Sequence, residues 1–173
     1  MNDSLNILFD EQTIERKVVE LAAQISRDYA GKELIAVCIL KGAALFTTDL
    51  VRHIAAEVTV DFAQAASYGA STAQPAEVLL EKDVSADISG KHVLLVDGIV
   101  DSGKTLAFLL ERYGKRNPAS LRVAVLLDKS ARRTVPVQID YKGFIIPDHF
   151  VVGYGMDAAE KYRNLPYIAT IMT

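Results

Sequence analysis

The residues best suited to chemistry form one short run, from Asp97 to Thr105, in which two aspartates frame a small polar turn. An apolar segment typical of a strand, residues 93–96, precedes this run. An apolar-periodic segment typical of a helix, residues 106–113, follows it. A strand, turn and helix in this order point several backbone N–H groups at one place, and the helix dipole adds to their attraction for an anion. The run therefore predicts a phosphate-binding site.

One interpretation of this run is a P-loop that binds a nucleoside triphosphate. Residues 98–105 match the pattern G-x-x-x-x-G-K-T, and the apolar run 122–128 ends in Asp128, as a metal-binding partner would. Against it, Ile99 and Val100 are bulky and β-branched, and such residues fit poorly in a loop that wraps its backbone around phosphates. Asp101 would also repel a triphosphate unless a metal intervened. A P-loop hydrolase or kinase remains an alternative hypothesis.

The second interpretation assigns the chemistry to the two carboxylates, Asp97 and Asp101. They are four residues apart on the rim of the turn. The turn itself, residues 102–105, would then be a cradle for one phosphate monoester. A carboxylate on the rim of such a cradle can face a sugar, so this interpretation favours a sugar phosphate as the ligand.

Composition sets limits on the class of protein. The chain has 173 residues, which predicts one domain, and it is 50% hydrophobic and 24% charged, as is ordinary for a soluble globular protein. The net charge of −3 gives no general reason to bind nucleic acid or an anionic membrane. We expect no secretory signal and no membrane span. The single cysteine, Cys38, is predicted to be a buried strand thiol, and a chain without an internal disulfide suits the cytoplasm.

Strand and helix patterns alternate along the chain and predict an α/β fold: a central, mainly parallel sheet with helices on both faces. Helices are predicted over about 11–29, 43–55 and 103–115, and strands over 34–40, 58–65, 77–84, 92–96 and 121–127. The short extended pieces at 143–147, 149–153 and 167–171 predict a small irregular lobe over the carboxyl edge of the sheet. We expect a single domain, 1–173, with its core at about 10–140. We expect a hood lobe, with some N-terminal contribution, mainly at 141–173.

The chain resembles a known family in several segments. Residues 93–106 resemble the phosphoribosyl-pyrophosphate motif of the type I phosphoribosyltransferases. Further segments resemble the hypoxanthine-guanine branch: a pyrophosphate loop at 40–42, the start of a flexible lid at 67–69, a purine-recognising lysine segment at 126–129, a purine hood at 146–157 and a distal motif at 160–167. The resemblance runs in order over nearly the whole chain, and the last two motifs are much more specific than a glycine-rich loop.

This resemblance implies an activity in purine salvage. The reaction is the Mg²⁺-dependent transfer of 5-phosphoribose from phosphoribosyl pyrophosphate to hypoxanthine or guanine, which gives IMP or GMP and pyrophosphate. The implied partners are that sugar phosphate and a 6-oxopurine base, with no nucleic acid and no membrane. Relatives usually form homodimers or homotetramers.

The resemblance also implies roles for particular residues. Asp101 is the candidate general acid/base near purine N7. The sugar phosphate and its pyrophosphate would be held by Asp97, Asp101, Ser102, Gly103, Lys104, Thr105, Lys41, Gly42 and Arg163. Ser67 and Tyr68 would form the lid. The purine would be contacted by Lys129, which donates to the 6-oxo group, by Phe150, Val151 and Asp157, and the metal would lie near Asp97 and Asp157.

This sequence departs from the family pattern at three places. The family usually has adjacent acids at the ribose site, and here Asp97 is followed by Gly98. The lid segment 70–76 lacks a basic residue, and His149 stands where a lysine is common. A relative that binds nucleotides without turnover is therefore a third hypothesis. The missing acid predicts weak binding of phosphoribosyl pyrophosphate, which Gly98→Asp is expected to tighten.

Overall fold

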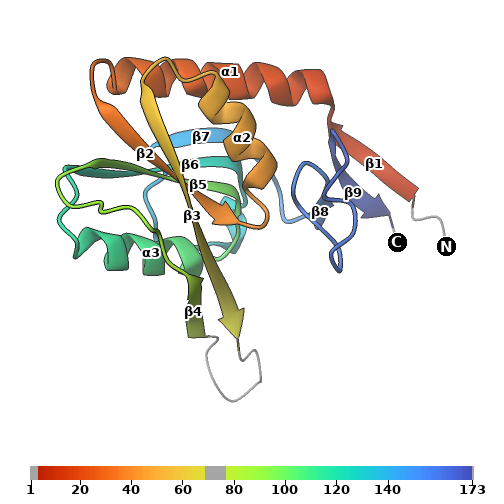
Figure 1. Cartoon of the computed structure of the whole chain (residues 1–173). Helices are drawn as coiled ribbons and strands as arrows, with labels where there is room; N and C mark the ends of the chain where they lie inside the picture. The colour runs from red at the N-terminus through yellow and green to blue at the C-terminus, as the bar shows by residue number, and fades with distance from the viewer. Residues whose placement is uncertain (1–3, 69–76, 173) are drawn as a thin grey trace.

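The fold is a six-stranded sheet with helices on both faces and a smaller three-stranded sheet beside it (Figure 1). A computed structural model describes residues 4–68 and 77–172. The main sheet has the order β4-β3-β2-β5-β6-β7. Its strands are β2 (Glu33–Leu40), β3 (Glu57–Tyr68), β4 (Glu77–Lys82), β5 (His92–Val100), β6 (Ser120–Asp128) and β7 (Tyr141–Ile145). All neighbours pair in parallel except β3 and β4, which confirms the predicted fold class.

Two hydrophobic cores form because the central strands are apolar on both sides. The helices are α1 (Glu11–Asp28), α2 (Ala44–Arg52) and α3 (Lys104–Gly114), with a short 3₁₀ helix, η1 (Ser130–Arg132). Asp10 caps α1 by accepting a hydrogen bond from the Thr13 N–H at 2.8 Å. The helices α1 and α2 bury their apolar stripes in one core, and α3 lies on the other face of the sheet in the second. Cys38 is buried, as expected.

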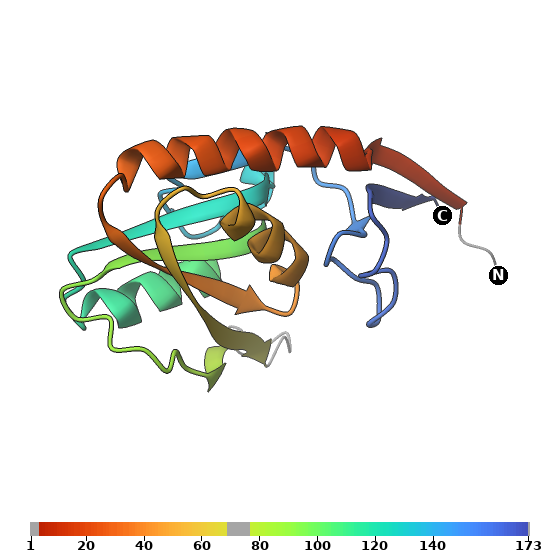
Figure 2. The same cartoon turned by 45° about the horizontal axis from the view of Figure 1, so that its top comes forward.

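The small sheet forms a hood at one end of the main sheet. It consists of β1 (Ser4–Phe9), β9 (Ile168–Met172) and β8 (Val151–Val152), all antiparallel. Figure 2 shows that α1 leads directly from β1 across the main sheet, so it joins the hood to the core. Hood residues Val151, Met156 and Ile168 belong to the same hydrophobic core as α1 and α2. The hood is therefore packed onto the sheet.

One boundary of the expected hood is wrong. Residues 143–147 were predicted to lie in the irregular lobe, but β7 pairs in parallel with β6 as the edge of the main sheet. Gly143 permits this pairing, because a Cβ at that position would collide with the Leu126 carbonyl of β6. The hood therefore begins after β7.

Among the residues that the structure describes, none of the helices is both long and apolar enough to span a membrane.

Candidate active site

The carboxyl ends of β2, β5 and β6 meet at one edge of the sheet, under the hood, and open α/β sheets bind ligands at this edge. Two cavities lie there. The first is lined by the turn after β5 and the end of β2, and the second by hood residues and the turn after β6. Gly42, Ile99 and Asp101 line both cavities. The two cavities therefore meet at Asp101, which is the predicted general acid/base.

The strand β5 extends further than the sequence predicted, and this overturns the P-loop interpretation. Ile99 and Val100 pair with Leu127 and Asp128 of β6, so half of the four-residue segment between the two glycines of the P-loop pattern is strand. Only residues 101–103 form the turn into α3. Asp128, the expected metal partner of a P-loop, is buried, with one carboxylate oxygen against Arg133 and the other 2.8 Å from Lys142. Both oxygens are thus occupied by cations of the protein.

The turn from Asp101 to Gly103 is held in shape by the chain beyond η1. The Ser102 carbonyl accepts hydrogen bonds from the N–H groups of Thr134 and Val135, both at 3.0 Å. Gly103 has a φ of +87° and is the N-cap of α3 without a side-chain capping bond. Ser102, Gly103 and Thr105 line the first cavity. The turn therefore presents the start of a helix to that cavity, which is the geometry expected of an anion cradle.

We expect Gly103→Ala to destabilise the protein strongly. The left-handed φ strains any residue with a Cβ, and a Cβ at Gly103 would lie 2.5 Å from the Val135 carbonyl oxygen. Gly90 has a φ of +68° with nothing within 4 Å of its Cβ position, so Gly90→Ala isolates the cost of the φ. Chemical denaturation should show a loss in the free energy of unfolding of about 1–2 kcal/mol for Gly90→Ala and about 3 kcal/mol or more for Gly103→Ala. Equal losses would show that the turn is not packed as described.

Asp97 lies on β5 and lines the first cavity; the residue as a whole is half-buried, but its carboxyl group is surrounded by protein atoms. Burial raises the pKa of its carboxyl to about 7, and the N–H groups of Ile99 and Gly98 oppose that rise only in part. Within the described part of the chain, its carboxylate has no salt bridge to a lysine, arginine or histidine. An acid that is buried without a cation is suited to receive a cation together with its ligand.

Asp101 is held through its backbone carbonyl, and its carboxylate keeps one buried oxygen without a hydrogen bond among the described residues. Its carbonyl accepts a hydrogen bond from Arg133 Nε at 3.2 Å. Its Oδ1 atom is buried and makes no hydrogen bond within the described residues. The nearest cation is Arg132, whose Nε lies 3.6 Å from Oδ1. The carboxylate therefore keeps an acceptor available at the junction of the two cavities.

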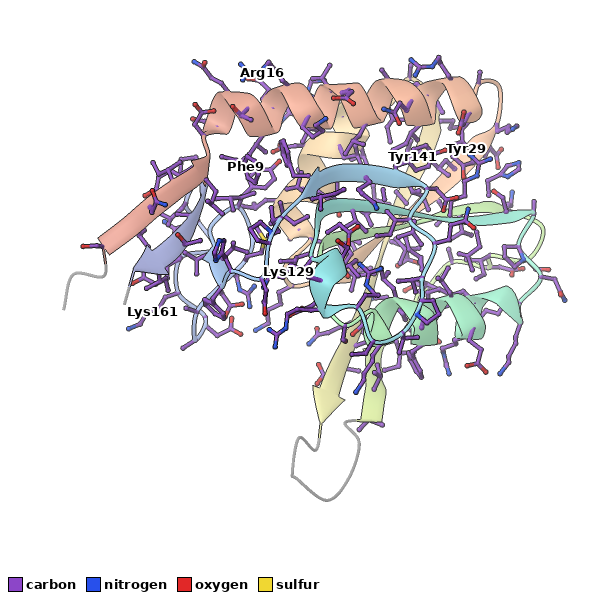
Figure 3. All side chains as sticks on the ribbon, turned by 180° about the vertical axis from the view of Figure 1, so that it is seen from behind. Phe9, Arg16, Tyr29, Lys129, Tyr141 and Lys161 are labelled. Atoms are coloured by element: carbon purple, nitrogen blue, oxygen red, sulfur yellow. The ribbon has the colours of Figure 1, made fainter. Side chains whose placement is uncertain are left out.

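Lys129 lies where β6 ends, between the main sheet and the hood (Figure 3). It is 4% exposed, and its Nζ lies 4.0 Å from the Asp148 carboxylate. Its N–H donates to the Val100 carbonyl at 3.0 Å, which fixes the turn after β6 to the end of β5. A buried ammonium group lining the second cavity is a strong donor for an oxo group.

Two neighbouring hood residues that differ in exposure line the second cavity. Phe150 is 61% exposed, and Val151 is 5% exposed. Both line the cavity together with Met156. An exposed aromatic ring and a buried lysine that line the same cavity offer stacking and a hydrogen-bond donor to one planar ligand.

Arg163 and Lys41 are linked through one acid, Glu160. Arg163 forms a 2.7 Å salt bridge with Asp157, donates to the Gly155 carbonyl at 2.7 Å and lies 3.3 Å from Glu160. Lys41 Nζ lies 3.3 Å from the same Glu160. Sequence reasoning missed this acid, because an exposed glutamate among other charges looks like ordinary solvated surface.

Three glycines bring the turn of residues 40–42, β5 and the hood into backbone contact. The Leu40–Lys41 peptide bond is cis. The Gly42 carbonyl oxygen lies 2.9 Å from the position that a Cβ on Gly98 would take, and a Cβ on Gly155 would collide with the same carbonyl. The space that an acidic side chain at Gly98 would enter is thus filled by backbone. The expectation that Gly98→Asp tightens binding is therefore revised.

Some predicted site residues are not brought together. Asp97 lines the first cavity and Asp157 the second, and no group of three or more metal-ligating side chains occurs among the described residues. Ser67 and Tyr68 lie at the end of β3, but their side chains are outside the described part of the structure. Residues 70–76 of the predicted lid are also outside it. Lys104 begins α3 and does not line either cavity. Arg132, which was not predicted, lines the second cavity.

Comparison with known proteins matches this chain to a family, to curated relatives and to solved structures. The family described as phosphoribosyl transferase domain matches residues 4–159. A hypoxanthine-guanine phosphoribosyltransferase of Streptococcus pneumoniae R6 is 44% identical over 170 residues, which are 98% of this chain and 94% of that protein. A crystal structure of a hypoxanthine-guanine phosphoribosyltransferase from Bacillus anthracis is similar with a TM-score of 0.91 and 45% identity, covering 99% of this chain and 100% of that one.

A longer relative has the same region as part of a larger protein. The bifunctional protein TilS/HprT of Listeria innocua is 41% identical over 170 residues, which are 98% of this chain and 26% of that protein. This chain therefore spans about a quarter of the length of that relative.

Proposed function

The chain belongs to the phosphoribosyl transferase family, and we propose that it transfers 5-phosphoribose from phosphoribosyl pyrophosphate to hypoxanthine or guanine. One observation carries this assignment. An anion cradle and a cavity with a buried lysine and an aromatic ring meet at a single carboxylate, Asp101. A sugar phosphate and a planar base placed in these cavities would join beside that carboxylate.

In the proposed reaction, the bond between ribose C1 and the pyrophosphate oxygen breaks, and its electron pair leaves with pyrophosphate. Purine N9 forms the new bond to C1, and the proton of N7 passes to the Asp101 carboxylate. The turn of residues 101–105 would hold the 5-phosphate through backbone N–H groups and the hydroxyls of Ser102 and Thr105. Arg163 and the Lys41–Gly42 turn would hold pyrophosphate. The Tyr68 lid would exclude water.

The first cavity fits a Mg²⁺ ion that arrives with the sugar phosphate. Asp97 is a buried oxygen ligand without a salt bridge to any described cationic side chain, and Mg²⁺ is usually held by one or two carboxylates together with substrate phosphates. Asp157 would act near the metal through water. When bound, the metal would neutralise pyrophosphate charge and so make pyrophosphate a better leaving group.

The second cavity favours 6-oxopurines over adenine. Lys129 donates hydrogen bonds and cannot accept one, so it suits the 6-oxo group and leaves the 6-amino group of adenine unmatched. Phe150 would stack on the ring, and the Val151 backbone would contact its edge. Chromatography of products made with hypoxanthine, guanine and adenine tests this assignment. We expect nucleotide from the two oxopurines at a kcat/KM at least about 10²-fold above that for adenine. Equal use of adenine would remove Lys129 as the selective group.

We expect Gly98→Ala and Gly98→Asp to weaken the binding of phosphoribosyl pyrophosphate by about tenfold or more. Either side chain would push the Gly42 carbonyl, and with it the turn that is proposed to hold pyrophosphate. Gly114→Ala is the matched control, because nothing lies within 4 Å of a Cβ at Gly114. Fluorescence or calorimetric titration gives the dissociation constants. Tighter binding by Gly98→Asp would mean that a carboxylate is tolerated here and that the ribose site lacks one.

A further inference from the structure

Arg132 stands between two carboxylates at the junction of the two cavities. Its Nε atom lies 3.6 Å from Asp101 Oδ1 and 3.5 Å from Asp148 Oδ2. Within the described ranges 4–68 and 77–172, it is the only cationic residue in a salt bridge with the Asp101 carboxylate. The positive charge next to the proposed acid/base therefore comes from a residue that no sequence motif singles out.

Backbone hydrogen bonds fix the position of the Arg132 main chain relative to Asp101. Its N–H donates to the Lys129 carbonyl at 3.0 Å, and the Lys129 N–H donates to the Val100 carbonyl at 3.0 Å. Val100 directly precedes Asp101, so Arg132 and Asp101 are tied through two short backbone bonds. The neighbouring Arg133 has another task, because its guanidinium binds the buried Asp128 and the Asp101 carbonyl.

We propose that Arg132 is a positioning residue that aims the Asp101 carboxylate at the purine. The inference rests on the proposed function. Asp101 Oδ1 is buried and has no hydrogen bond, so no other described side chain sets the direction of this carboxylate. A planar guanidinium can hold a carboxylate in one orientation in a way that a mobile ammonium cannot.

Asp148 completes this arrangement. When the N7 proton passes to Asp101, that residue becomes neutral and no longer balances the charge of Arg132. Asp148, whose Oδ2 atom lies 3.5 Å from Arg132 Nε, remains as its partner. Arg132 therefore has a carboxylate partner before and after the proton transfer, and it need not move during the reaction.

Steady-state kinetics with Mg²⁺, phosphoribosyl pyrophosphate and hypoxanthine test this role. We expect Arg132→Ala to lower kcat by about 10–100-fold, because the acid/base is misdirected. The KM for phosphoribosyl pyrophosphate should stay within about threefold. Arg132→Lys should recover only part of the loss. Millimolar guanidinium chloride should raise the kcat of Arg132→Ala several-fold, whereas sodium chloride at the same concentration should not.

The matched control is Arg112→Ala. Arg112 lies on α3, is about as exposed as Arg132 and forms a 2.9 Å salt bridge with Asp83. It lines neither cavity. The Arg112→Ala variant should have a kcat within about twofold of the unmodified protein, and guanidinium should not raise it. A kcat for Arg132→Ala within twofold of the unmodified protein, or an absence of rescue by guanidinium, would overturn the inference. If the unmodified protein itself forms no nucleotide, the proposed function fails instead, so the two failures are distinguishable.

Discussion

Replacement of Asp101 by asparagine is expected to lower kcat by about 10²–10⁴-fold, the usual contribution of a general acid/base. Asparagine keeps the shape of the side chain but cannot take up the purine proton. The fold should be retained, because Asp101 Oδ1 makes no hydrogen bond that asparagine would lose. Arg132 would still have Asp148 as a partner. Substrate binding should therefore change far less than turnover.

Single-turnover kinetics and binding titrations separate these two effects. Asp87→Asn is a suitable control, because Asp87 is exposed and lines neither cavity. It should behave as the unmodified protein does. A near-normal turnover for Asp101→Asn would remove Asp101 as the acid/base and leave it as part of the phosphate turn.

Replacement of Asp97 by asparagine is expected to change function and stability in opposite directions. The lost charge should weaken the binding of phosphoribosyl pyrophosphate with Mg²⁺ by about 10–150-fold, which corresponds to about 1.5–3 kcal/mol for an interaction of a charged group. The free protein should become more stable at neutral pH, because the buried carboxylate no longer has to ionise without a partner.

The pH dependence of this stability gain has a definite sign. The pKa of Asp97 is raised from its ordinary value of 3.8 to about 7 in the folded protein. The folded state therefore binds the proton more tightly than the unfolded state does, and Asp97 destabilises the fold progressively as the pH rises from about 4 to about 7. Above that range the loss in the free energy of unfolding caused by Asp97 is constant, at no more than about 4 kcal/mol.

Thermal denaturation of the unmodified protein and of Asp97→Asn between pH 5 and pH 8, without ligand, measures this difference in stability. We expect the Tm of Asp97→Asn to exceed that of the unmodified protein by an amount that grows as the pH rises. The exposed Asp87→Asn variant should show no such growth. A Tm advantage that shrinks toward pH 8 would mean that the Asp97 carboxylate is stabilised in its ionised form, contrary to its position in the structure.

Much of the fold could be predicted because its signals are local. The capped helix after Asp10, the buried central strands and the turn after β5 follow from periodicity, capping and hydrophobicity. The end of β5 was misplaced at Val96, although Ile99 and Val100 are β-branched and so favour a strand. The same two residues argued against a P-loop. Residues 143–147 were assigned to an irregular lobe because Pro147 breaks the segment, whereas Gly143 lets β7 approach β6 closely.

The parts of the site that escaped prediction depend on contacts between distant segments. The effect of Gly98 depends on the Gly42 carbonyl, which reaches it only once β2 and β5 are neighbours. Arg132, Asp148 and Glu160 look like solvated charges in the sequence, and their roles come from what they face. Asp97 and Asp101 could be selected from the sequence because both flank a recognisable turn.

The most direct test of the central claim is phosphorus NMR of the purified protein with Mg²⁺, phosphoribosyl pyrophosphate and hypoxanthine. The account predicts that the sugar phosphate is consumed while IMP and pyrophosphate appear in equal amounts, and that omission of hypoxanthine stops their formation. Binding without turnover would indicate a relative that only binds its ligands. Hydrolysis of ATP with phosphoribosyl pyrophosphate left intact would contradict the account.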